Sequence, residues 1–179
     1  YGSPSQLLAG IIYSITAGVF AACAAQLSDR IRLRGYDPTE GGDCALAAVT
    51  AGVLFMTLGR IDYPPCNVGR LLAAVFLLIG TERRGASHAA VPGIAVLAGL
   101  CASGSAGLTE AGAVCLAAFL SCFLSRYGRM TRAVGALFFG CAALLAGGAD
   151  NSSWRVFAEL SAAGAVYIVL PRSWLGTAD

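Results

Sequence analysis

The chain has 179 residues and a formal net charge of only +2, and 57% of its residues are hydrophobic while 12% are charged. Because a soluble domain usually has about 25% charged residues, this composition excludes a water-facing globular protein. The mean hydropathy of +0.72 and the 23 glycines instead predict an all-α integral membrane protein whose helices pack closely in lipid.

Seven apolar runs follow one another along the sequence. We predict that they form a single transmembrane domain, residues 1–179, a polytopic helix bundle of about seven spans. Several runs are shorter than the roughly 20 residues that cross a bilayer, and the second, third and seventh are the weakest predictions. The runs are residues 7–25, 44–59, 65–80, 88–104, 108–125, 133–149 and 155–170.

The first run follows YGSPSQ, which contains neither an initiator methionine nor the basic segment that opens a signal peptide. We therefore expect the chain to be a fragment of a longer protein. Within this run, small residues recur at every fourth position, at Gly10, Ser14, Gly18 and Ala22. Such a stripe lets two helices approach closely, so these four residues are candidate packing positions.

The longest polar stretch, SDRIRLRGYDPTEGGD (28–43), separates the first two runs. We expect a cytoplasmic hairpin whose DPTEGGD part caps the second helix. The acidic residues do not follow the spacing of an EF-hand calcium loop. The alternative is a docking surface for a cytoplasmic partner.

Three charged residues lie inside predicted spans, where a charge is costly to bury and function is a frequent reason for it. We expect Arg70, one turn into its span, to extend to the interface, and Glu110 to be stabilised at the N-terminus of its helix. Glu159 follows Arg155 by four positions, so these two side chains are expected to pair. All three lie near the non-cytoplasmic ends of their spans, which disfavours a transport path through the middle of the membrane.

The fourth run carries a second stripe of small residues, Ala95, Gly99, Ser103 and Gly107, which are further candidate packing positions. Pro92 is expected to bend this span.

No residue pattern indicates catalysis or metal binding. The seven cysteines form no CxxC pair, and five of them lie inside apolar runs, which favours small apolar residues over metal ligands or disulfides. His88 is expected at the membrane interface, with a proton relay or a metal ligand as the alternative. There is no nucleophile elbow, HExxH motif or P-loop, so no catalytic residue and no cofactor is predicted in this chain.

The arginines predict the orientation, because positively charged loops stay on the cytoplasmic side of a membrane. Counted over alternate connections, nine arginines fall on one side of the predicted bundle and three on the other. The N-terminus of the chain is therefore expected outside and the C-terminus in the cytoplasm.

The stretch FLSRYGRMTR (123–132) contains the densest group of arginines. Together with the preceding cytoplasmic connection, it supplies candidate contacts for anionic lipid headgroups or for a cytoplasmic region. The candidates are Arg83, Arg84, Arg126, Arg129 and Arg132. Only Tyr127 is available for base stacking, so no nucleic-acid partner is predicted.

Four stretches carry a family resemblance: DPTEGGDCALAAVTAGVL, NVGRLLAAVFLLIGTERRGASHAAVPGIAVLAGL, EAGAVCLAAFLSCFLSRYGRMTRAVGALFFG and FAELSAAGAVYIVLPRSWL. Over about residues 37–175, the chain resembles the membrane region of the stage II sporulation protein E family, phosphatases of endospore-forming bacteria. It departs from the family at Glu40-Gly41, where the family commonly has two glutamates. It also departs at Tyr127, which takes the place of an arginine of the family.

The resemblance implies that the chain holds the last seven of about ten spans in a bacterial cell membrane. A cytoplasmic regulatory region and a protein phosphatase 2C-like domain, which uses manganese or magnesium, would follow. That domain would dephosphorylate an anti-sigma factor antagonist and so activate a forespore sigma factor. The resemblance also implies a location at the polar septum, with cell-division proteins and the protein's own cytoplasmic domains as partners.

The sequence therefore predicts a module embedded in the lipid bilayer that anchors, localises and self-associates a sporulation-type phosphatase. We expect the module to form a homo-oligomer and not to be an enzyme itself. The alternative is a small-solute transporter or channel-type membrane protein. A membrane scaffold unrelated to sporulation is a third interpretation.

Overall fold

The structure, a computed structural model, describes residues 4–34, 41–63, 66–104, 106–148 and 153–171. These residues are mostly helical, and the predicted all-α class is confirmed. The elements in chain order are α1 (Pro4–Arg34), α2 (Gly41–Leu58), β1 (Asp62–Tyr63), β2 (Cys66–Asn67), α3 (Val68–Ala102), α4 (Leu108–Ser121), the 3-10 helix η1 (Cys122–Tyr127), α5 (Arg129–Ala146) and α6 (Ser153–Val169).

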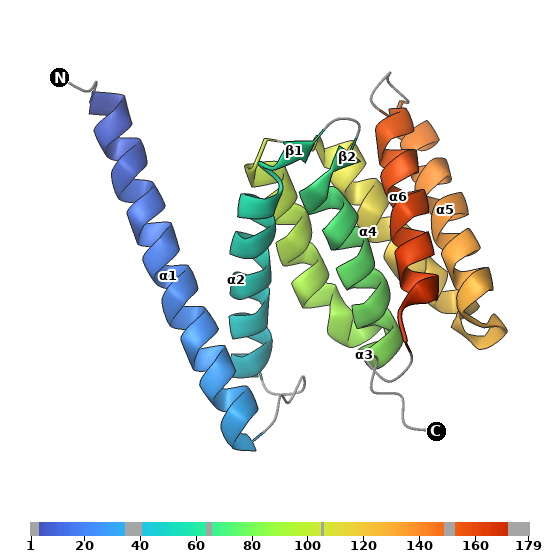
Figure 1. The fold of residues 1–179 in the computed structure, drawn as a ribbon, viewed down its shortest axis with the longest axis horizontal. Helices are drawn as coiled ribbons and strands as arrows, with labels where there is room; N and C mark the ends of the chain where they lie inside the picture. Colours follow the sequence, from blue (N-terminus) through green and yellow to red (C-terminus); the bar gives the residue numbers. More distant parts are fainter. Residues whose placement is uncertain (1–3, 35–40, 64–65, 105, 149–152, 172–179) are drawn as a thin grey trace.

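Helix α3 is a helical hairpin rather than one straight rod. Gly85 has a φ of 76° and a ψ of 170°, whereas the rest of the element is helical, and a positive φ is readily adopted only by glycine. The chain reverses direction there, so a first arm (68–84) and a second arm (Ser87–Ala102) run side by side (Figure 1). Pro92 lies inside the second arm, whose backbone is helical, and a bend of this arm at Pro92 stays a prediction.

The described residues thus form seven helical segments: α1, α2, the two arms of α3, α4 with η1, α5 and α6. Each overlaps one of the seven apolar runs. Three of the described helices are long and apolar enough to cross a membrane, namely Gly41–Leu58, Leu108–Tyr127 and Arg129–Ala146, while Ser87–Ala102 is apolar but shorter.

The two arms of α3 pack with α4, α5 and α6 around an apolar core, and α2 lies against α3 (Figure 1). Helix α1 contacts α2 at the edge of the bundle, and its N-terminal half leans away from α2 (Figure 1). The core is filled by small and branched side chains, among them Leu77, Val96, Leu100, Val114 and Leu160. Large apolar side chains also cover the outside of the bundle, for example Leu116, Val134, Phe138 and Phe157.

The short hairpin β1–β2 lies where α2 ends and α3 begins (Figure 1). Asp62 pairs with Asn67 and Tyr63 with Cys66 in an antiparallel register. This register holds Asn67 directly before α3, where it is the N-cap residue of that helix.

Candidate functional site

Most of the buried polar side chains belong to two clusters, one where α3 begins and one where α5 begins. These two helices begin at opposite ends of the bundle (Figure 1). At the hairpin end lies the Arg70 cluster, which consists of Asn67, Arg70, Glu110 and Glu159. At the opposite end lies the Arg132 cluster, which consists of Thr81, Glu82, Arg129, Arg132 and Tyr167.

The Arg70 cluster is a guanidinium held between two carboxylates. Arg70 lies in the first turn of α3, and its Nη1 donates to Glu110 Oε2 at 2.6 Å. On the other side, Nη2 is 3.0 Å from Glu159 Oε1 and Nε is 2.8 Å from Glu159 Oε2. Only the Nη2 contact has the geometry of a hydrogen bond, and the Nε contact adds Coulombic attraction between the same two groups.

Asn67 connects this ion pair to the backbone at the end of α2 and at the start of α3. Its backbone N–H donates to Glu159 Oε1 at 2.6 Å, and its Nδ2 donates to the carbonyl oxygen of Gly59, after α2, at 2.8 Å. Its Oδ1 accepts the backbone N–H of Arg70 at 3.0 Å, as an N-cap side chain does. The end of α2, the start of α3 and the buried face of α6 are therefore fixed to one another.

Two expectations about these charges are wrong. Arg70 does not extend to the interface, because two carboxylates inside the bundle compensate its charge. Glu159 pairs with Arg70 rather than with Arg155, whose guanidinium lies over the ring of Trp154 on the exposed side of α6. Glu110 does lie in the first turn of its helix.

Arg132 is the largest fully buried side chain at the other end, with 1% of its surface exposed. Its Nη2 donates to the carbonyl oxygen of Leu78 at 3.2 Å and to the hydroxyl of Thr81, both on the first arm of α3. Its guanidinium carbon is 5.8 Å from the centre of the Tyr167 ring, within the range of a cation–π contact.

Arg129 approaches the same ring from one turn earlier in α5, at 5.7 Å. Its Nε is 3.1 Å from Glu82 Oε1 at the end of the first arm of α3. Its Nη1 donates to the carbonyl oxygen of Leu170, just past α6, at 2.9 Å. Arg129 therefore joins α3, α5 and the C-terminal end of α6.

The structure brings two of the five candidate arginines together, Arg129 and Arg132, and turns both toward the bundle. Arg126, in η1, and Arg83, in the first arm of α3, are exposed and separate from them. The side chain of Arg84 lies outside the described residues. Contact of any of them with lipid headgroups or with a cytoplasmic region stays a prediction.

A sequence signal for the burial of Arg132 was present in the spacing of α5. Arg132, Ala136, Gly140 and Leu144 recur at every fourth position, and all four are buried. Residues at this spacing share one face of a helix. Because Arg132 begins this series of small and apolar residues, its position on the buried face of α5 could have been predicted from the sequence.

The small-residue stripe in the second arm of α3 packs inside the chain. A Cβ on Gly99 would collide with the carbonyl oxygen of Gly52 in α2, and a Cβ on Gly52 would lie 3.2 Å from the carbonyl oxygen of Ala95. The two backbones thus meet with no room for a larger side chain at Gly99. Ser103 is the C-cap residue of α3 and Gly107 the N-cap residue of α4.

The stripe in α1 lies differently. Ser14, Gly18 and Ala22 are exposed, and no described atom lies within 4 Å of a Cβ built on Gly18. Gly10 lies on the same helix, but its surroundings are outside the described residues. Any packing role of this stripe therefore requires something other than the described part of this chain.

The polar loop between the first two runs is described at its two ends. Arg30, near the end of α1, donates from Nη1 to Asp43 Oδ1 at 2.8 Å, and Asp43 is fully buried in the first turn of α2. This pair fastens α1 to α2. The predicted cap around Glu40 lies outside the described residues.

The two clusters hold helices together. All seven cysteines are free thiols. Within the described ranges, no three His, Cys, Asp or Glu side chains are grouped closely enough to hold a metal ion. What the clusters supply is a set of buried ionic contacts between helices that are far apart in the sequence.

The chain gives no match to a protein-family model, to a curated protein or to a solved structure. Its resemblance to the stage II sporulation protein E family therefore rests on the motifs quoted above.

Proposed function

We propose that this chain is the membrane-anchoring, localising and self-associating module of a sporulation-type serine/threonine protein phosphatase that activates a forespore sigma factor at the division septum. The observation that supports it best is the attachment of α6 at two places, at Glu159 near its middle and at Leu170 just past its end. A module that orients a cytoplasmic region must hold its last helix in a fixed position, and the buried contacts of α6 are of the kind that does so.

One attachment is the pair of contacts between Glu159 and Arg70. The other is the hydrogen bond from Arg129 to the carbonyl oxygen of Leu170, beside the fully buried Tyr167. Glu159 lies about two turns into α6 and Leu170 just past its end, so a rotation of the helix would not preserve both contacts. The C-terminal half of α6 is thereby held in the bundle.

The charges of the two clusters support the proposed orientation. The Arg132 cluster contains two guanidiniums and one carboxylate, whereas the Arg70 cluster contains one guanidinium and two carboxylates. The excess positive charge thus lies at the end where α6 finishes (Figure 1). Because cytoplasmic segments are enriched in arginine, we propose that this end faces the cytoplasm.

We also propose that all seven helical segments cross the membrane. Three are long and apolar enough by themselves, and the others lie beside them in the same bundle (Figure 1). Outward-facing side chains such as Phe138, with 69% of its surface exposed, and Ile94, with 68%, suit contact with lipid chains.

The position of the polar residues favours an anchor over a transporter. Transport paths place polar or ionisable side chains along the interior of the bundle. Between the two clusters, the buried side chains of the described ranges are apolar, among them Ala73, Ala74, Val114, Ala117 and Ala163.

The proposal is tested by fusing a fluorescent protein after residue 179 and expressing the fusion in a sporulating bacterium. We expect fluorescence on the cytoplasmic side, enriched at the polar septum, and a protease-accessible tag placed before residue 1 on the outside. The parent gene is expected to encode a phosphatase domain after this chain. An even distribution over the membrane, or a parent gene without such a domain, contradicts the proposal.

A matched pair of variants separates the role of α6 from general stability. Arg129→Gln removes the contact with Leu170, whereas Arg126→Gln changes an exposed arginine three positions away. With the phosphatase region attached, we expect Arg129→Gln alone to change phosphatase regulation while membrane insertion stays normal. Equal effects of the two substitutions contradict an orienting role for α6.

A further inference from the structure

Most helices of the bundle are short for a membrane protein. Helices α2 and α5 have 18 residues each and α6 has 17, and at a rise of 1.5 Å per residue these helices are about 26 Å long. The second arm of α3, Ser87–Ala102, is shorter still. An ordinary bilayer has a hydrocarbon core about 30 Å thick, which takes about 20 helical residues to cross. None of these four described segments reaches that length.

Charged side chains shorten the apolar part of the helices further. Along α2, the residues between Asp43 and the exposed Arg60 carry no charge, and along α4 and η1 the same is true between Glu110 and the exposed Arg126. Each stretch has about 15 residues and is about 24 Å long. We call this uncharged part of the outer surface the apolar band. It is about 6 Å shorter than an ordinary hydrocarbon core is thick.

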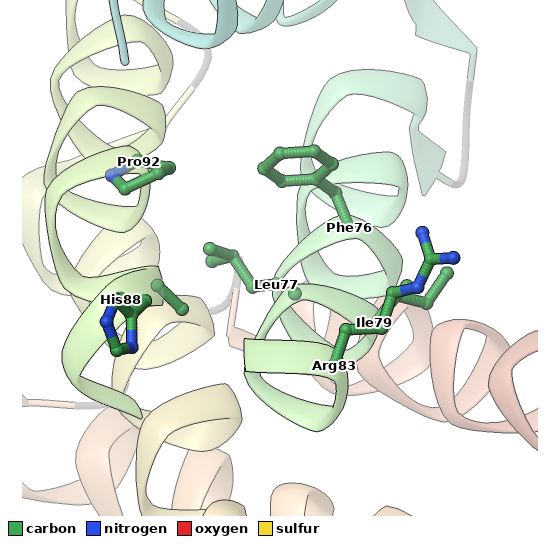
Figure 2. A pocket seen from close by; sticks show the side chains of 8 residues that line it. Phe76, Leu77, Ile79, Arg83, His88 and Pro92 are labelled. Carbon is green, nitrogen blue, oxygen red and sulfur yellow. The ribbon is translucent and has the colours of Figure 1, made fainter. Parts of the chain in front are cut away.

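The two arms of α3 show where the apolar band ends on their side of the bundle. Near the bend, the exposed side chains include Arg83 and His88, whereas Phe76 and Pro92 lie further from the bend (Figure 2). Both arms therefore lose their apolar surface within about one turn of the bend. The bend lies at the same end of the bundle as the Arg132 cluster (Figure 1).

Trp154 marks the opposite boundary of the band. It lies in the first turn of α6, at the hairpin end of the bundle (Figure 1), and it is 56% exposed. The guanidinium carbon of Arg155 is 5.8 Å from the centre of its ring. Tryptophan is enriched where a membrane meets water. Because α6 runs from this boundary to the other end, its 17 residues give an independent height for the band of about 26 Å.

A thin hydrocarbon layer also suits the Arg132 cluster. Within the described ranges, Nε and Nη1 of Arg132 and Nη2 of Arg129 have no hydrogen-bond partner. Such donors are costly deep in hydrocarbon, where no water is available, and less costly near the headgroups. Arg70 and Glu82, one from each cluster, are about 12 positions and thus about 18 Å apart along the first arm. A layer of about 24 Å therefore brings both clusters closer to the headgroups than a layer of about 30 Å does.

Helix α1 differs from the other helices in length and in inclination. It has 31 residues, and its N-terminal half leans away from α2 (Figure 1). A helix longer than the hydrocarbon layer adapts to it by tilting. The inclination of α1 is therefore compatible with a layer whose thickness is set by the shorter helices.

We propose that the apolar band of the bundle fits a hydrocarbon layer about 24 Å thick, so that the chain binds phospholipids with short acyl chains in preference to long ones. An ordinary bilayer must thin around a short band, and the cost rises with each ångström of difference. Lipids with short chains remove that cost. The proposal rests on the membrane location contained in the proposed function, and requires neither septal targeting nor a phosphatase domain.

The test is competition between lipids for the surface of the full chain in vesicles. Phosphatidylcholine with brominated 18-carbon chains quenches tryptophan fluorescence, and Trp154 is exposed on the outer surface. Unbrominated phosphatidylcholine with monounsaturated chains of 14, 18 or 22 carbons is mixed in, and the recovery of fluorescence measures displacement. Because mismatch grows with chain length, we expect the 14-carbon lipid to displace the brominated lipid about fivefold more effectively than the 22-carbon lipid does. The shared headgroup excludes an effect of charge.

A matched pair of variants tests the boundary at η1. Arg126→Leu removes the exposed charge that ends the band there, so the advantage of the 14-carbon lipid should fall about twofold. Arg126→Lys keeps a positive charge at the same place and should leave the advantage unchanged. The comparison of the three lipids on the unaltered chain does not depend on any variant folding.

Equal displacement by the three lipids, or strongest displacement by the 18- or 22-carbon lipid, would overturn the proposal. Equal lipid preferences of Arg126→Leu and Arg126→Lys would contradict it as well. Flotation of the same vesicles separates these results from a failure of the proposed function. A chain that floats with all three lipids but prefers none keeps its membrane location, whereas a chain that floats with none contradicts both proposals.

Discussion

Arg70 and Glu159 are 89 positions apart in the sequence, and their side chains form two contacts, at 3.0 and 2.8 Å, inside the helix bundle. The pair joins the first arm of α3 to α6, and Glu110 of α4 approaches Arg70 from the other side at 2.6 Å. Three helices are thus held by one guanidinium. Because only 1% of Glu159 is exposed, its charge depends on this partner for compensation.

Replacement of Arg70 by Met should strongly destabilise the chain, because it leaves two carboxylates without their cation. The expected loss is about 3–5 kcal/mol in the free energy of unfolding, the usual cost of removing one member of a buried pair. Equilibrium unfolding in mixed detergent micelles measures it. The combined change Arg70→Met with Glu159→Met should recover part of the loss, because the more deeply buried of the two carboxylates is then removed and only Glu110 stays unpaired.

Arg155→Gln is the matched control for this prediction. Arg155 lies one turn before Glu159 and is exposed, so its replacement should change the unfolding free energy by less than about 0.5 kcal/mol. If Arg155→Gln were as damaging as Arg70→Met, the pairing of Glu159 with Arg70 would be refuted.

Tyr167 should contribute to stability mainly through its ring, because the guanidiniums of Arg129 and Arg132 both lie over it. Tyr167→Leu removes both cation–π contacts and leaves unfilled space, so we expect a loss of about 2–4 kcal/mol. Tyr167→Phe keeps the ring and should cost about 1 kcal/mol or less. Thermal unfolding of the two purified variants distinguishes them, and equal losses would mean that the hydroxyl is the important group.

The close crossing of α2 and α3 makes Gly99 sensitive to the smallest enlargement. A methyl group there would collide with the carbonyl oxygen of Gly52, so Gly99→Ala should destabilise the chain by about 1–3 kcal/mol. Gly112→Ala, where a Cβ meets no described atom, should be neutral or slightly stabilising because alanine favours helix. Unfolding free energies that do not differ between the two variants would argue against this crossing.

The helices were predictable because the signals that define them are local. The run at 44–59 corresponds to α2, and the run at 133–149 to α5, since apolar composition and flanking polar residues act within a few positions. The break between the third and fourth runs was also visible, in the polar segment around Gly85.

The partners of the charged residues were not predictable in the same way. Glu159 has Arg155 one helical turn away, so local spacing favoured that pair. The observed partner, Arg70, is brought there by the packing of α3 against α6, which no short stretch of sequence encodes. For Arg132 a usable signal did exist, since Ala136 and Gly140 follow it at every fourth position on the buried face of α5.

A substitution in the exposed stripe of α1 should test self-association of the chain without changing its folding. No described atom lies within 4 Å of a Cβ built at Gly18, and the residue is exposed, so Gly18→Leu should leave the unfolding free energy unchanged within about 0.5 kcal/mol. If copies of the chain associate through the stripe that includes Ser14 and Ala22, the same substitution should keep their helices apart, because close approach requires small residues. Energy transfer between labelled copies in vesicles measures association, with Gly112→Leu as the control for a leucine added at another open position. Loss of transfer with Gly18→Leu alone is the expected result; unchanged transfer would mean that α1 faces lipid and that any oligomer forms through another surface.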